Sequence, residues 1–82
     1  MKKPKIKPSE SEVQNCLSII LSDYPSYPKS LNYAVGYVRA GKELTGHALE
    51  VQCLYILNNI SHWRHPEAKR VRDILKKFAE VK

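Results

Sequence analysis

The sequence is poor in cysteine and in long apolar runs, and each shortage excludes a class of protein. Its 82 residues include two cysteines, too few for the disulfide framework of a small secreted domain. The longest apolar run, 53–57, is far shorter than the roughly 20 residues that a membrane-spanning helix needs. The basic start is followed by the polar segment 9–12 rather than by the apolar region of a signal peptide. We therefore expect a cytoplasmic protein with no membrane contact, in which Cys16 and Cys53 are buried, reduced thiols.

Motifs for catalysis and for cofactor binding are also missing. The sequence has no glycine-rich phosphate loop, no nucleophile elbow and no H-E-x-x-H motif. Both cysteines fall on apolar stripes, so neither can be argued to pair with a histidine as a nucleophile. His62 and His65 form only the histidine half of a zinc site, because no C-x-x-C pair accompanies them. We expect a protein that is not an enzyme and that uses no cofactor and no metal.

What the sequence does contain is the composition of one soluble domain. Hydrophobic residues make up 43% of the chain and charged residues 27%, and this length suffices for one packed core. Apolar residues recur every three to four positions in four segments, and no alternating run typical of a strand competes with them. We predict an all-α fold, a small bundle of four helices near residues 9–23, 28–40, 46–63 and 66–80, with the third helix central.

Local signals mark the ends of these helices. Ser9 and Glu12 fit the capping box S-x-x-E, and Thr45 is a candidate N-cap for the third helix. Pro28 and Pro66 can occupy first helical positions, where the missing N–H costs nothing. Tyr24 falls on the apolar stripe of the first helix. The residues expected to form the core are Leu17, Ile20, Leu31, Val35, Val38, Leu49, Cys53, Ile56, Ile60, Trp63, Val71, Ile74, Leu75 and Phe78.

The net charge of +6 is placed mainly at the two ends of the chain. The first eight residues hold four lysines, and we expect them to form a flexible basic arm before a single helical domain at 9–82. Residues 64–82 hold seven basic and three acidic side chains. A row of cations on a helix can follow a DNA or RNA backbone, because each neutralised phosphate releases counterions. The predicted nucleic-acid contacts are Lys2, Lys3, Lys5, Lys7, Arg64, Lys69, Arg70, Arg72, Lys76 and Lys77.

The same charges also fit an ordinary solvated helix face. Asp73 lies three or four positions from several of these cations and can pair with them. A helix-turn-helix motif over the second and third helices fits poorly, since its tight turn usually has a small residue at a fixed offset, whereas here Gly41 and Gly46 bracket the link. The third helix is also too apolar to lie freely in a major groove. If nucleic acid binds, the last helix and the arm are the better candidates.

Tyrosines offer a second candidate surface, because the chain has five of them. Tyrosine supplies rigid contact area and a hydroxyl, so it is enriched at recognition surfaces, although in so small a protein it also closes the rim of the core. This pattern favours a protein-interaction module as the alternative function, with a host protein or a second copy of the chain as partner. The predicted partner contacts are Tyr33, Tyr37, Val51, Tyr55, Asn58 and His62.

The stretch LEVQCLYILNNISHWR at 49–64, followed by AKRVRDIL at 68–75, resembles small uncharacterised helical proteins of bacteriophages and related mobile elements. The resemblance covers roughly residues 31 to 78. It implies a bacterial host cytoplasm and a role in phage DNA metabolism, gene regulation or interference with a host system, which includes anti-CRISPR proteins. Anti-CRISPR proteins that mimic DNA are mostly acidic, whereas this chain is basic, so other modes of inhibition fit better. A nucleoprotein complex as partner would satisfy both functional hypotheses.

Overall fold

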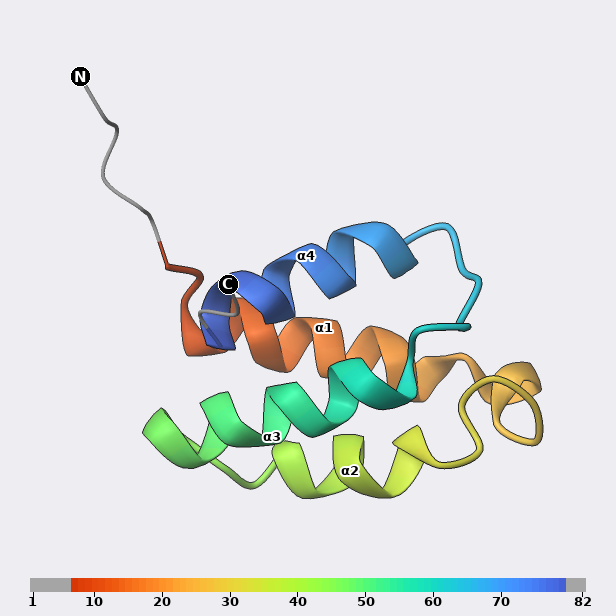
Figure 1. Cartoon of the computed structure of the whole chain (residues 1–82), viewed down its shortest axis with the longest axis horizontal. Coiled ribbons are helices and arrows are strands. Elements are labelled where there is room, and N and C mark those ends of the chain that lie inside the picture. Colours follow the sequence, from red (N-terminus) through yellow and green to blue (C-terminus); the bar gives the residue numbers. More distant parts are fainter. Residues whose placement is uncertain (1–6, 80–82) are drawn as a thin grey trace.

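The computed structural model describes residues 7–79, and four α-helices account for most of them (Figure 1). No strand occurs within these residues. The predicted all-α bundle is therefore confirmed. The elements in chain order are α1 (Glu10–Ser22), the short 3-10 turn η1 (Tyr24–Ser26), α2 (Ala34–Gly41), α3 (Gly46–Asn59) and α4 (Ala68–Ala79).

Each helix packs against its neighbours in the chain, and α1 also packs against α4, which closes the bundle. The contact between α3 and α4 is the most extensive, followed by the contact between α2 and α3. The third helix is thus the central one, as predicted. None of the helices within 7–79 has both the length and the apolar character that crossing a bilayer requires.

Two expected core residues lie at the rim instead. Val35 and Ile74 are half-buried, because each is turned away from the line of fully buried residues on its helix. On α2 that line runs through Ala34 and Val38. Tyr24, expected on the core stripe, is 69% exposed because α1 ends before it. The buried hydrophobic residues are Val13, Cys16, Leu17, Ile20, Leu31, Ala34, Val38, Leu49, Cys53, Ile56, Ile60, Trp63, Ala68, Val71, Leu75 and Phe78.

The capping box at the start of α1 is confirmed. The Ser9 hydroxyl accepts from the Glu12 N–H at 3.1 Å, and the Glu12 carboxylate accepts from the Ser9 N–H at 3.1 Å. Thr45 occupies the N-cap position of α3 in an extended conformation, but its side chain makes no capping bond. Glu10 of α1 supplies the cap instead, since its carboxylate accepts from the Gly46 N–H at 2.8 Å.

Three of the predicted helices are shorter than expected. Residues 27–33 form consecutive turns, so α2 begins at Ala34 and Pro28 is not a first helical residue. The third helix ends at Asn59 because Ile60 leaves the helical conformation, with φ −119° and ψ 16°. Residues 66–67 form a turn, and α4 begins at Ala68; its predicted end at residue 80 lies outside the described residues.

Trp63, expected at the end of the third helix, instead fixes the link between α3 and α4. Its side chain is 1% exposed, and its indole N–H donates to the Asp23 carboxylate at 2.8 Å. The same carboxylate accepts from the Ser26 hydroxyl at 2.7 Å. These hydrogen bonds from Ser26 and Trp63 lower the pKa of Asp23. The α3–α4 link is thereby tied to the end of α1.

Candidate binding surface on α3 and α4

The outward face of α3 is almost uncharged. Glu50 is the single Asp, Glu, Lys or Arg residue in the sequence of this helix. Leu54 is 40% exposed and Tyr55 is 49% exposed, although both belong to residue types that usually line a core or its rim. The central helix therefore presents apolar and aromatic side chains to solvent.

Tyr37 of α2 joins this face. Its ring stacks on that of Tyr55 with the centroids 5.8 Å apart and the planes 18° apart. The Gln52 side chain donates to the Tyr37 carbonyl at 2.9 Å and so ties α3 to α2 at this point. Tyr37, Leu54 and Tyr55, which we call the α3 face, are all partly exposed, at 40% to 49%.

The remaining predicted partner contacts are placed less uniformly. Val51 and Asn58 belong to α3, the first half-buried and the second exposed. His62 is exposed but lies in the turn after α3 has ended. Tyr33 precedes α2 and is 77% exposed. The structure thus brings Tyr37 and Tyr55 together, a pairing between two helices that spacing within one helix cannot reveal.

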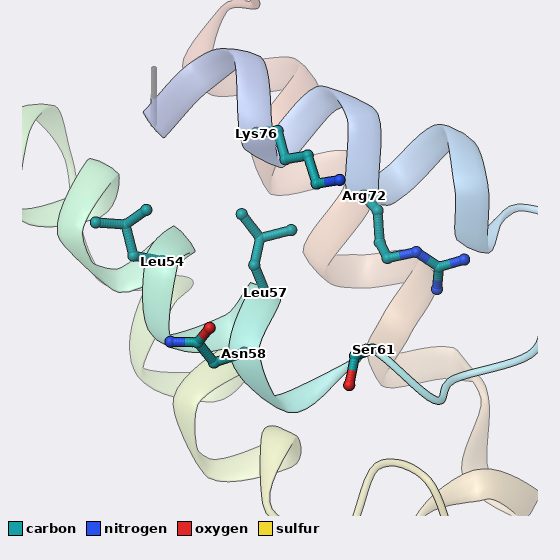
Figure 2. A pocket seen from close by; sticks show the side chains of 6 residues that line it. All are labelled: Leu54, Leu57, Asn58, Ser61, Arg72 and Lys76. Carbon is teal, nitrogen blue, oxygen red and sulfur yellow. The ribbon is translucent and has the colours of Figure 1, made fainter. Parts of the chain in front are cut away.

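An open groove lies between side chains of α3, α4 and the link that joins them (Figure 2). Its volume is about 550 Å³. Leu57 points from α3 toward α4, and the side chains of Arg72 and Lys76 lie across from it. No acidic side chain of residues 7–79 is among the lining residues. The α3–α4 groove is lined by Leu54, Leu57, Asn58, Ser61, Arg72 and Lys76.

Arg72 has a structural role that the sequence did not reveal. Its guanidinium Nη1 donates to the Trp63 carbonyl at 3.0 Å and to the Ile60 carbonyl at 3.3 Å. The Ile60 carbonyl belongs to the C-cap of α3 and also accepts from the Trp63 N–H at 3.1 Å, whereas the Trp63 carbonyl lies in the link between α3 and α4. A cation from α4 therefore bonds the C-cap of α3 and the link that follows it, and one lining residue of the groove is held in place.

The other predicted cations of α4 are divided between two flanks. Lys76 follows Arg72 by four positions and also lines the groove. Arg70 lies on the opposite flank, where its Nε donates to the Glu67 carboxylate at 2.6 Å. This hydrogen bond and the attraction to Glu67 raise the pKa of Arg70. Arg64, Lys69 and Lys77 are exposed.

Lys7 is the one lysine of the predicted arm that the structure describes; Lys2, Lys3 and Lys5 lie outside the described residues. Its ammonium group pairs with the Glu50 carboxylate and lies 4.9 Å from the centre of the Phe78 ring. His47 also bonds Glu50, at 3.1 Å, and Lys7 and His47 together lower the pKa of that carboxyl. Lys7 is thus engaged with α3 and α4.

The two cysteines are buried, as predicted, and both are free thiols. Burial raises the pKa of Cys53 to about 12 and also raises the pKa of Cys16, so both remain protonated at neutral pH. Residues 7–79 hold no group of three or more His, Cys, Asp or Glu side chains that could bind a metal. His65 stacks on Trp63 with the ring centres 5.1 Å apart and accepts from the Glu67 N–H.

Comparison of the chain with protein-family models, with curated proteins and with solved structures finds no match in any of the three. The resemblance to small phage proteins therefore stays a prediction.

Proposed function

We propose that this protein is a non-enzymatic interaction module that recognises another protein through the α3 face. The observation that carries the proposal is the stacking of two exposed tyrosines, Tyr37 and Tyr55, beside the exposed Leu54, on a chain with a net charge of +6. Exposed aromatic and aliphatic side chains that cluster are typical of protein interfaces, where tyrosines supply much of the binding energy.

The needs of the fold do not account for this surface. A helix that only covers a core carries polar residues on its solvent side, because exposed apolar groups add nothing to stability. Leu54 lies on the solvent side of α3 and Tyr55 lies beside it. Since α3 already contributes Leu49, Cys53 and Ile56 to the core, the outward residues are available for a partner.

A second candidate is nucleic-acid association, and the exposed Lys69, Lys76 and Lys77 of α4 favour it. Such a row can contact phosphates without sequence preference. This candidate has less support, because Arg70 and Arg72 donate to groups of the protein itself and Lys7 pairs with Glu50. It predicts binding to DNA or RNA that falls steeply with salt and that is measurable at about 50 mM salt.

A capture experiment separates these two functions. The full chain is used to capture proteins from bacterial lysate with and without nuclease, a source suggested by the resemblance to phage proteins. For a protein partner such as a host or defence component, we expect capture that survives nuclease and that the Tyr37→Ala/Tyr55→Ala variant loses. Tyr24→Ala is the control, since Tyr24 is 69% exposed but lies in η1. Nuclease-sensitive capture that is unchanged in the double variant would instead establish nucleic-acid association.

A further inference from the structure

The α3–α4 groove has an apolar floor, which shares Leu54 with the α3 face. Leu54 and Leu57 lie three positions apart on α3, which places them on the same side of that helix. Leu54 is 40% exposed and Leu57 is half-buried. An apolar side chain from outside the protein would gain buried contact area on both leucines. The floor therefore suits an aliphatic or aromatic side chain.

The wall of the groove on the α4 side is cationic. Arg72 is held by its two hydrogen bonds to the Ile60 and Trp63 carbonyls, and both bonds use one nitrogen of a guanidinium that has further donors. Lys76 is exposed and lies one turn further along α4. Because these charges meet no carboxylate among the lining residues of the described chain, they favour carboxylates from outside.

We infer that the α3–α4 groove binds an acidic amphipathic helix of the protein partner, with an apolar side chain against Leu54 and Leu57 and carboxylates beside Arg72 and Lys76. Helix-in-groove binding uses this combination of apolar anchors and flanking charges. The inference rests on the proposed function and adds the chemistry of the partner. A phosphate backbone fits less well, since it would leave both leucines without apolar contacts.

A second copy of the chain is a poor occupant. The described acidic helix, α1, uses its apolar face in the core through Val13, Leu17 and Ile20. Its two carboxylates already serve as caps, because Glu10 accepts from Gly46 and Glu12 accepts from Ser9. Within residues 7–79, α1 therefore cannot present an acidic and apolar surface to the groove of another copy.

A peptide titration of the full, isotope-labelled chain tests the inference. The probe is a designed helical peptide of about four turns with leucines along one face and glutamates beside them. A second peptide with lysine in place of every glutamate is the control. We expect the acidic peptide to shift the amide signals of Leu54, Leu57, Asn58 and Ser61, and the basic peptide to leave them unchanged.

Two variants with the same change in net charge sharpen the test. Lys76→Glu places an acid at the groove, whereas Lys77→Glu places one on the adjacent flank of α4. We expect Lys76→Glu to weaken binding of the acidic peptide by about tenfold or more and Lys77→Glu by less than about threefold. Circular dichroism confirms that both variants fold.

Several outcomes would overturn the inference. Equal losses in the two variants, or equal binding of acidic and basic peptides, would show that the groove does not select carboxylates. Shifts at Tyr37 and Tyr55 without shifts in the groove would contradict this inference while agreeing with protein binding by the α3 face. Displacement of the peptide from the groove by a DNA duplex would indicate nucleic acid as the occupant. The lysate capture tests the proposed function separately, because it depends on the tyrosines.

Discussion

Helices α3 and α4 pack against each other but present chemically different surfaces to solvent. On α4 the buried residues Val71, Leu75 and Phe78 share one side, and lysines occupy the other. On α3 the core side is equally apolar, but Leu54 and Tyr55 face outward. The lysines of α4 need no further explanation, since charged residues are usual on the solvent side of a helix. The surface of α3 needs a different explanation, and partner binding is the one we propose.

The two helices also differ in how their ends are stabilised. The last turn of α3 has no basic residue, whereas the last turn of α4 has Lys76 and Lys77, which interact favourably with the negative end of the helix dipole. Arg72 of α4 donates to the Ile60 and Trp63 carbonyls, which come after the last residue of α3. One cation of α4 therefore belongs to the fold, while its exposed lysines are available for other contacts.

The largest effect on stability is expected when the buried and the exposed sides of α3 are substituted one at a time. Ile56 is fully buried, so Ile56→Ala should lower the free energy of unfolding by about 2–5 kcal/mol through lost burial and the cavity left behind. Leu54→Ala on the exposed side should cost less than about 1 kcal/mol. Urea denaturation followed by the fluorescence of the single tryptophan measures both. Equal losses would mean that Leu54 serves the fold and would remove support for the α3 face.

The next effect concerns the link between α3 and α4. Asp23→Ala leaves the buried indole N–H of Trp63 without its acceptor, and we expect a loss of about 1–3 kcal/mol in the free energy of unfolding. Asp23→Glu, which keeps a carboxylate but moves it, is the matched control and should lose less. A loss as large in Asp23→Glu would show that the position of the carboxylate matters more than its presence.

The Asp23 carboxylate should also make the stability of the folded protein depend on pH. The pKa of Asp23 is lowered in the folded protein, so its stabilising contribution is complete above the ordinary value of 3.8 and is lost as the pH falls through the lower folded value. Asp23→Asn removes this titration. Between about pH 5 and pH 2, wild type should therefore lose more stability than Asp23→Asn in the same denaturation experiment. Parallel losses in the two proteins would assign the acid sensitivity to other carboxylates.

Local patterns predicted the helices well because each pattern depends on residues close in the chain. The capping box at Ser9 and the apolar stripe of α4 needed no knowledge of distant contacts. Helix ends were predicted less well, since they depend on tertiary bonds. Trp63 lies in the link after α3, where its indole bonds Asp23, forty positions earlier. No spacing rule within α3 contains that information.

The candidate surface was predictable only in part for the same reason. Tyr37 and Tyr55 were each identified, but their stacking depends on how α2 packs against α3. The α3–α4 groove combines Leu54 and Leu57, which carried no predicted role in binding, with cations predicted to contact phosphates. Sequence periodicity assigns residues to faces of single helices, whereas the groove is formed by faces of two.

A smaller effect on stability should distinguish Arg72, which bonds the backbone of this protein, from the exposed Lys69 on the same helix. Arg72→Gln removes charged donors from the Ile60 and Trp63 carbonyls, and we expect a loss of about 1–2 kcal/mol in the free energy of unfolding. Lys69→Gln is the matched control on the same helix, because Lys69 is exposed and its substitution should change stability by less than about 0.5 kcal/mol. Similar losses would contradict a specific role for Arg72.

The smallest effect is expected on the flank of α4 that bears Arg70. Glu67→Gln removes the exposed ion pair with Arg70, whose attraction is offset by side-chain entropy and weakened by salt. The midpoint of urea denaturation should therefore stay within experimental error at low and at high salt. A clear loss of stability at low salt that disappears at high salt would show that this ion pair stabilises the fold. Arg70 would then belong, like Arg72, to the cations that the fold itself requires, and the exposed lysines alone would remain available for a partner.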